Sequence, residues 1–308
     1  MRTAIARSAA LTGTLLVLVY TAFISSADAI TKLLAGGYAA PQLYAVSGLL
    51  VVAMAMTADR VKSGPRQGLR TTCPRAMALR SALTVVSVTC YFYAFRLLPF
   101  AEVFVFIGLV PLMAGLLSGP VLGEHVRAPA WLALGAGFIG VLCLFPGGLA
   151  GISSGHLVAF AASFTGTLSM VISRYIGRHE ANTLAQVFYP NLTLALVMAL
   201  ALPFVWKPMP LTDLGWAAAY AGVLFAGRWI LVIALSKLAA YAVTPLMNLQ
   251  FVWMVILGAV FFGEVPGSQI YLGVAIVISS GTYLVYDRLA ADRREAEALR
   301  ATGVVAAE

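Results

Sequence analysis

Ten apolar segments, most of them about 20 residues long, follow one another along the chain with short connections. They are 12–34, 41–58, 76–98, 100–119, 129–147, 155–176, 183–205, 214–236, 241–262 and 268–288. Charged residues make up only 10% of the chain, whereas soluble domains carry about 25%. The strands of a membrane β-barrel would instead be alternating segments of about ten residues. The sequence therefore predicts an all-α membrane protein with ten transmembrane helices.

The first segment has a second interpretation, as a secretory signal that is removed. Two arginines precede its apolar run, and Ala27-Asp28-Ala29 has the small-x-small pattern of a cleavage site. Cleavage there would leave the sixth segment without the counterpart that it has in the repeat described below. We therefore predict that the first segment is retained as a membrane helix.

The positions of Lys and Arg predict how the helices are oriented. With the N-terminus in the cytoplasm, most of the twenty basic residues fall in cytoplasmic connections, and the outer connections hold only Arg96 and Lys207. We expect an inner-membrane protein with both termini in the cytoplasm and a cytoplasmic tail at 289–308. The net charge of +8 is then explained by basic residues that set the membrane topology and contact lipid headgroups. No nucleic-acid partner is therefore expected.

The chain also repeats itself at an offset of about 140 residues. Gly123-Glu124 follows the fourth segment as Gly263-Glu264 follows the ninth, and Lys32 corresponds to Arg174. The two repeat units, of five segments each, are 12–147 and 155–288. Because each unit crosses the membrane an odd number of times, the second unit is inserted with the opposite topology. Such inverted repeats are typical of secondary transporters, which bind their substrate between the repeats.

Two stretches resemble the paired EamA units of the drug/metabolite transporter superfamily. The first reads "YFYAFRLLPFAEVFVFIGLVPLMAGLLSGPVLGE" and the second "TPLMNLQFVWMVILGAVFFGEVPG", and the resemblance extends from Thr12 to Arg288. The stretch "SSADAITKLL" is further similar to a bacterial branch that includes carriers for S-adenosylmethionine and riboflavin. This branch commonly has an arginine where Ser47 or Gly48 stands here, and an acidic-tyrosine pair at Met247-Asn248, so its substrate is not carried over.

Ionisable side chains inside the segments are the first candidates for a binding site, because they are costly in a membrane. Asp28 and Lys32 are spaced i, i+4, so they share one helix face. Either they pair with each other, or Asp28 binds a proton or a substrate ammonium and Lys32 binds a carboxylate. Arg228, midway along the eighth segment, either pairs with Asp28 or carbonyl groups or binds an anionic part of the substrate. We favour substrate binding by Arg228.

Other charged side chains are expected to have structural roles. Arg80 lies one turn inside the third segment and can reach the cytoplasmic headgroups. Glu102 is expected to pair with Arg96 across the tight connection between the third and fourth segments. Glu124 and Glu264 lie just past the ends of segments, where we expect them to bond to nearby helix termini.

Neutral side chains complete the candidate site. Asn248 and Gln250 follow Pro245, which frees a backbone carbonyl and bends the ninth segment, and both can hydrogen-bond a substrate. Aromatic side chains that either stack on a flat ring or only pack are Tyr91, Tyr93, Phe106, Tyr189, Trp229 and Trp253. From this group the predicted site includes Tyr91, Phe106 and Trp229.

Together these features predict a secondary transporter that moves a small anionic or zwitterionic metabolite by alternating access. A phosphate-binding nucleotide loop is absent from the sequence, so a gradient is expected to drive transport. The alternatives are a membrane-embedded enzyme and a non-transporting sensor or assembly partner. The histidines are scattered along the chain, so neither a metal site nor an enzyme is predicted, and no cofactor is expected. Candidate partners are the substrate, membrane lipid, protons as a coupling ion and a second copy of the chain.

Overall fold

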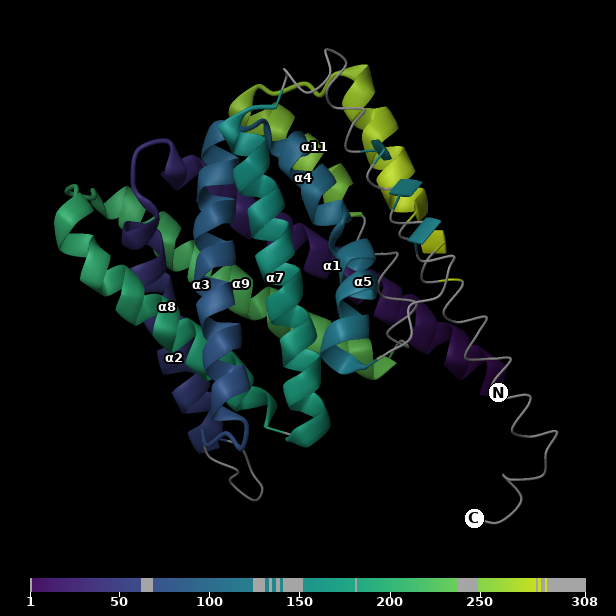
Figure 1. Cartoon of the computed structure of the whole chain (residues 1–308), viewed down its shortest axis with the longest axis horizontal. Helices are drawn as coiled ribbons and strands as arrows, with labels where there is room; N and C mark the ends of the chain where they lie inside the picture. The colour runs from purple at the N-terminus through teal and green to yellow at the C-terminus, as the bar shows by residue number, and fades with distance from the viewer. Residues whose placement is uncertain are drawn as a thin grey trace.

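The computed structural model describes residues 2–61, 69–123, 152–180, 182–237 and 249–280, with short stretches between 131 and 140 and between 282 and 286. Within these ranges the chain is a bundle of helices (Figure 1), which confirms the all-α fold class. The helices are α1 (Arg2–Ala35), α2 (Ala40–Val61), α3 (Pro74–Leu97), α4 (Phe100–Gly108), α5 (Val110–Leu122), α7 (Ser154–His179), α8 (Thr183–Val205), α9 (Leu211–Lys237) and α11 (Gln250–Phe262). A further apolar helix spans Ser268–Ser280.

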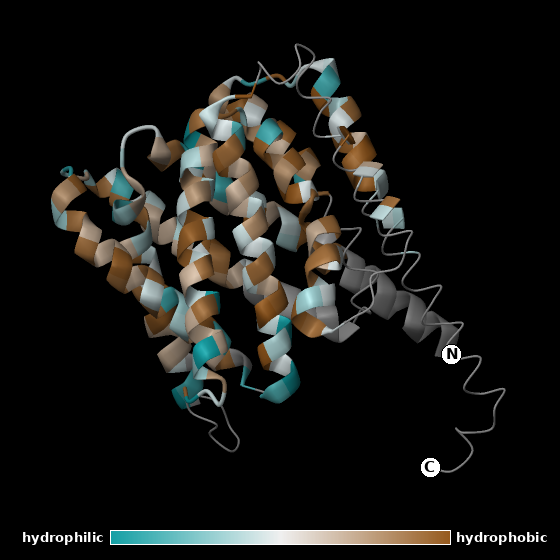
Figure 2. Ribbon diagram, in the orientation of Figure 1, coloured by the Kyte–Doolittle hydropathy of each residue, from teal (hydrophilic) through white to brown (hydrophobic). Residues whose placement is uncertain are grey.

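Several of these helices are long and apolar enough to cross a membrane. In the described part of the chain there are five: 15–35 of α1, 40–57 of α2, α3, α7 and 184–205 of α8. Large apolar side chains also point outward along the bundle, among them Leu132, Leu157, Leu196, Leu200 and Phe204. Figure 2 shows apolar residues along the helices and hydrophilic residues gathered at the lower ends of α3 and α7. This distribution is that of a multi-pass membrane protein whose helices face lipid.

The fourth predicted segment is not one continuous helix. The chain turns by 40° between α4 and α5, at Leu109. Pro111 stands in the first turn of α5, and without an N–H it cannot bond to the carbonyl of Ile107. The fourth predicted segment is therefore formed by two helices with a bend between them, because the proline interrupts the backbone hydrogen bonds. The fifth predicted segment, 129–147, and the start of the ninth lie largely outside the described residues.

The repeat is visible as the same local structure formed twice. Helices α5 and α11 each have 13 residues, begin directly after Leu109 and Leu249, and end at Gly123 and Gly263. Both glycines have left-handed backbones, with φ of 69° and 65°. Side chains other than glycine rarely adopt this conformation, so glycine at these positions ends each helix without strain.

Helix packing follows the same symmetry. Helix α3 packs on α7 as α1 packs on α9, and these pairs are equivalent when the two halves are exchanged. Likewise, α3 packs on α8 as α9 packs on α2, and α5 packs on α7 as α11 packs on α1. Helix α2 also packs on α8, its own equivalent in the other half. These shared partners are those expected of two halves related by a two-fold axis, whereas, among the described residues, the contact of α1 with α3 has no comparable counterpart between α7 and α9.

The buried faces of α1 and α7 also correspond. At an offset of 142 residues, which aligns Lys32 with Arg174, most buried residues of α1 fall on buried residues of α7. Among these pairs are Thr21 and Ser163, Ser25 and Thr167, Ala27 and Ser169, Ile30 and Ile172, and Leu34 and Ile176. The two helices therefore present the same face to the interior of the bundle.

Candidate functional site

One face of α1 carries four polar residues that contact the second half of the molecule. Thr21, Ser25, Asp28 and Lys32 are spaced by three or four residues, so they form one row along the helix. We call this row the α1 polar face. Each of its members contacts α11 or the residues that follow α11, so the row lies at the boundary between the two halves.

Gln250 is the centre of this contact. Its Nε2 donates a hydrogen bond of 3.0 Å to Oδ2 of Asp28, and its backbone carbonyl accepts a bond of 3.3 Å from Oγ of Ser25. Gln250 is the first residue of α11 and is buried. One turn further along α11, Nε1 of Trp253 donates a bond of 3.2 Å to Oγ1 of Thr21. The structure therefore brings together two of the predicted site residues, Asp28 and Gln250, from opposite halves.

Lys32 does not pair with Asp28 in the described structure, although the spacing allowed that pair. Its Nζ lies 2.8 Å from Oε1 of Glu264 and donates a bond of 2.7 Å to the carbonyl of Leu98. It also lies 5.4 Å from the centre of the Phe262 ring. The carboxylate, the carbonyl and the ring surface together satisfy the ammonium group, so the alternative of a self-paired Asp28 and Lys32 was wrong.

Glu264 uses its second oxygen to cap a helix. Oε2 accepts a bond of 2.7 Å from the backbone N–H of Phe100, the first residue of α4. The N–H groups in the first turn of a helix have no partner within the helix, and Pro99 before α4 has no side chain that caps it. The expectation that Glu264 bonds to a helix terminus is confirmed, whereas Glu124 lies outside the described residues.

Tyrosine hydroxyls from several helices lie near Asp28. The hydroxyl of Tyr91, on α3, is hydrogen-bonded to Oγ of Ser163, on α7, at 2.9 Å, and the Tyr91 ring stacks on Phe95. Tyr44, on α2, lies beside Tyr220, on α9, with ring centres 6.0 Å apart. Both Tyr44 and Tyr91 interact electrostatically with Asp28. A carboxylate, an amide and several hydroxyls from both halves therefore form one polar cluster.

Tyr44 and Tyr220 were not among the residues predicted from the sequence. No signal marked Tyr44, since a tyrosine one turn inside an apolar segment takes the interfacial position that is common for tyrosine. Tyr220 could be added only from packing, because nothing in the sequence indicates that α9 lies against α2.

Phe106 and Glu102 have other neighbours than those expected. Phe106 is buried in the apolar core, and its ring lies 6.2 Å from the imidazole of His156. Oε2 of Glu102 lies 3.2 Å from Nε2 of His156, while Arg96 is exposed at the end of α3. The predicted pair of Glu102 with Arg96 was wrong, because α4 packs against the first turn of α7 and so brings His156 within reach.

Arg80 has the structural role that was expected of it, through a different partner. Its Nη1 donates a hydrogen bond to the backbone carbonyl of Gln186, on α8. The contact ties α3 to α8 within the bundle. The contact of Arg80 with lipid headgroups stays a prediction.

Three predicted site residues cannot be placed. Asn248 and the side chains of Arg228 and Trp229 lie outside the described residues. The backbone beside them is informative, because a Cβ at Gly227 would lie 3.4 Å from Phe23 and Ile24. Helix α9 thus approaches α1 closely next to Arg228, one turn before Asp28.

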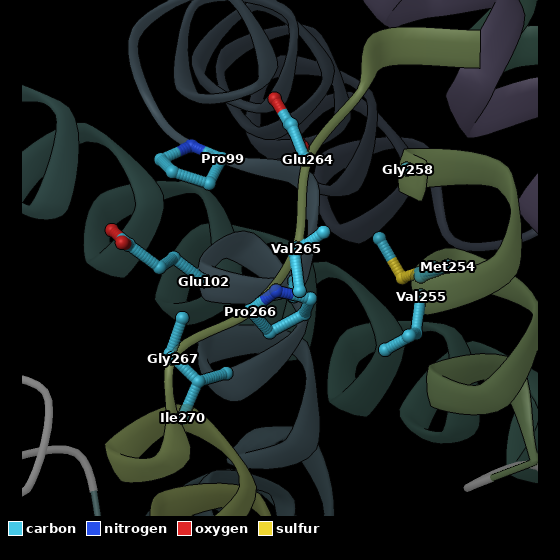
Figure 3. A pocket seen from close by; sticks show the side chains of 11 residues that line it. Pro99, Glu102, Met254, Val255, Gly258, Glu264, Val265, Pro266, Gly267 and Ile270 are labelled. Carbon is cyan, nitrogen blue, oxygen red and sulfur yellow. The ribbon is translucent and has the colours of Figure 1, made fainter. Parts of the chain in front are cut away.

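A small cavity lies beside Glu264 (Figure 3). It has a volume of about 130 Å³ and is lined by residues that include Pro99, Glu102, Met254, Glu264, Pro266 and Ile270. Binding pockets for metabolites usually have volumes of about 300–1,000 Å³, so this cavity has room for water but not for a substrate. Among the described residues no group of His, Cys, Asp and Glu could hold a metal ion.

Several transporters are similar to the chain along most of its length. The riboflavin transporter of Vibrio cholerae is 27% identical over 235 residues, which cover 75% of this chain and 78% of the relative. The pseudopaline exporter of Pseudomonas aeruginosa is 26% identical over 208 residues, which cover 66% and 72%. The S-adenosylmethionine uptake transporter of Rickettsia conorii is 24% identical over 233 residues, which cover 74% and 78%.

A solved crystal structure has the same fold, with a TM-score of 0.59 and 20% identity over 92% of this chain and 99% of the other. The EamA-like transporter family matches the chain twice, over residues 11–145 and 153–286. The first match contains the α1 polar face and the second contains α11, so the polar cluster lies between two family units. These matches confirm the resemblance found in the sequence motifs. The chain belongs to the EamA-like transporter family.

Proposed function

We propose that the protein is a secondary transporter that carries a small zwitterionic or anionic metabolite across the inner membrane by alternating access. The observation that supports this most is the hydrogen bond of Asp28 with Gln250, which places a carboxylate between the two halves of a membrane protein. Inverted repeats commonly bind their substrate at such a boundary, where movement of one half against the other exposes it to either side.

The polar cluster suits a substrate that carries an ammonium group. Among the described side chains, the hydrogen-bond donor to Asp28 is Gln250, and an ionised carboxylate can accept several further bonds. The hydroxyls of Tyr44 and Tyr91 offer neutral donors and acceptors near it. In the absence of substrate, Asp28 would take up a coupling proton. Arg228, on the neighbouring α9, would bind the anionic end, so that a zwitterion satisfies both charges.

Family membership makes the protein a transporter and argues against the alternative of a membrane-embedded enzyme. The relatives are named for riboflavin, pseudopaline and S-adenosylmethionine, so related proteins carry different small molecules in different directions. This range supports a metabolite as cargo and leaves import and export open. The distribution of Lys and Arg supports an orientation with both termini in the cytoplasm.

A thermal-shift screen of the purified protein tests the proposal. The panel holds zwitterionic, anionic, cationic and uncharged metabolites, each measured against wild type, Asp28→Asn and Asp59→Asn. Asp59 lies near the end of α2 and serves as the matched control, because it undergoes the same chemical change away from the cluster. We expect a zwitterion to raise the melting temperature of wild type and Asp59→Asn but not of Asp28→Asn. An equal rise in Asp28→Asn would exclude Asp28 from the binding site.

A further inference from the structure

Lys32 is held at one end of the bundle by groups from two other segments, the connection between α3 and α4 and the residues that follow α11. Its ammonium contacts the Glu264 carboxylate and the Leu98 carbonyl, and Glu264 in turn accepts the N–H of Phe100. We call these four groups the latch. Lys32, Leu98 and Phe100 belong to the first half of the molecule and Glu264 to the second, so the latch joins the two halves directly.

The latch lies one helical turn from the polar cluster. Asp28 and Lys32 share the α1 polar face. Glu264, which follows α11, contacts both Lys32 at the end of this face and Phe100 at the start of α4. Lys32 lies between Asp28 and the end of α1 at Ala35. The side chains of Lys32 and Glu264 are 11% and 27% exposed, so the latch borders solvent on its outer side.

We propose that the latch closes the binding site at this end, and that Lys32 and Glu264 control access instead of binding the cargo. This inference rests on the proposed transport function. The contacts suit a reversible closure, because both charged groups are near solvent and regain water when the halves separate. The backbone contacts make the closure specific, since the lysine must donate to Leu98 while the glutamate accepts from Phe100.

The repeat supplies a counterpart at the other end. Arg174 and Glu124 correspond in sequence to Lys32 and Glu264. The last turn of α7 does contact the end of α5 in the described structure, because Nη1 of Arg178 donates a bond of 3.0 Å to the carbonyl of Leu122. A basic group of α7 therefore meets the C-terminus of α5, as Lys32 of α1 meets the residues after α11. Alternating access would release the two ends in turn.

The test measures access without any substrate. Ala101 is 4% exposed and lines the cavity beside Glu264, so Ala101→Cys serves as a probe in a background that lacks Cys73, Cys90 and Cys143. A membrane-impermeant maleimide is applied from the outer face, the side on which the proposed orientation places the latch. We expect the cysteine at position 101 to be labelled about tenfold faster in the Glu264→Gln and Lys32→Met variants than in the protein with an intact latch. This factor corresponds to the loss of a charge-assisted hydrogen bond.

Three further variants make the test specific. Lys32→Arg keeps both the charge and the donors, so it should label as slowly as the intact latch. Glu180→Gln makes the same chemical change in the connection between α7 and α8 and should leave labelling unchanged. In the exchange Lys32→Glu with Glu264→Lys the opposite charges remain, but Leu98 loses its donor and Phe100 its acceptor, so labelling should stay fast.

Unchanged labelling in Glu264→Gln and Lys32→Met, in protein of normal melting temperature, would overturn the gate. Slow labelling in the charge exchange would also contradict it, because the ion pair alone would then suffice. The outcome is separate from that of the metabolite screen, which depends on Asp28. Fast labelling of the latch variants together with an unaffected thermal shift in Asp28→Asn would retain the gate and remove the proposed site.

Discussion

The contact between α1 and α11 and the contact between α7 and α5 are equivalent in the two halves, but their chemistry differs. In the first, Gln250 and Trp253 of α11 bond to the α1 polar face. At the equivalent positions of α5, 140 residues earlier, stand Val110 and Met113. Asp28 likewise corresponds to Met170 on α7 at the offset of 142 residues.

This difference in chemistry distinguishes the features that build the fold from the residues of the proposed site. Helix lengths, left-handed glycine ends and packing partners are shared by the halves, so the repeat alone accounts for them. The hydrogen bond of Asp28 with Gln250 is not needed to hold such helices together, because the equivalent positions carry the apolar residues Met170 and Val110. An ionisable group in a membrane helix is costly, so its presence in one half only indicates function.

The largest effect is expected when Asp28 of the first half is replaced by methionine, the residue at the equivalent position 170 of the second half. Asp28→Met should abolish uptake or export in proteoliposomes, because the substrate ammonium loses the carboxylate of Asp28. The melting temperature of the protein without substrate should not fall, since a charge in the membrane has been removed. Unimpaired transport by this variant would show that the polar difference between the halves has no function.

The reverse change should destabilise the protein without creating a site. Met170 is 45% exposed on α7, and the structure shows no amide on α5 to meet a carboxylate there. Met170→Asp should lower the free energy of unfolding by about 2–3 kcal/mol, the cost of an acidic residue inside a membrane helix. Chemical denaturation in detergent measures this, with Met170→Leu as the control. A neutral effect would mean that α7 accepts an acid as readily as α1 does.

A smaller effect is expected at the partner of Asp28. Gln250→Val introduces the residue found at the equivalent position of α5 and removes the donor to Asp28. Binding of a zwitterion from the thermal-shift screen should weaken by about tenfold, because the carboxylate is no longer held in place. Gln250→Asn retains an amide on a shorter side chain and should lie between Val and wild type in titration calorimetry. Equal affinity in all three proteins would exclude Gln250 from positioning Asp28.

The smallest effect is expected at Glu180, in the connection between α7 and α8. The equivalent connection in the first half, between α1 and α2, has different contacts. Partial burial raises the pKa of Glu180, but hydrogen bonds from Thr72 and Thr71 outweigh it, so the pKa lies below its usual value of 4.5. A lowered pKa in the folded state stabilises the protein above the unfolded pKa, and this contribution is lost as the pH falls below 4.5. Glu180→Gln should flatten the pH dependence of the melting temperature in this range by a small amount. An identical profile would show that these bonds contribute nothing.

Much of the fold could be predicted because it follows from local patterns. Apolar segments gave the helices, and the Gly-Glu motifs indicated the ends of α5 and α11. The break at Leu109 was missed, although Pro111 signals it, because the surrounding segment is uniformly apolar. Asp28 was predicted as a site residue because it is ionisable inside an apolar segment, and Gln250 because it is polar and follows Pro245.

The contacts themselves could not be predicted, because they depend on packing between distant segments. Lys32 and Glu264 were both identified as charged residues in the sequence. Only the folded structure, in which the end of α1 lies beside the α3–α4 connection, shows that their side chains form an ion pair. Spacing along one helix favoured Asp28 as the partner of Lys32, and adjacency along the chain favoured Arg96 as the partner of Glu102. In each case a residue from the other half, Glu264 or His156, is the partner instead.

The central claim is that the cargo binds between α1 and α11 and not between α7 and α5. An experimental structure of the protein with a zwitterion identified in the thermal-shift screen tests it most directly. We expect the ammonium group of the ligand to lie within hydrogen-bond distance of Asp28, with Gln250 beside it and the Lys32–Glu264 contact free of ligand. A ligand bound against Val110 and Met170, or one that replaces Glu264 at Lys32, would contradict it.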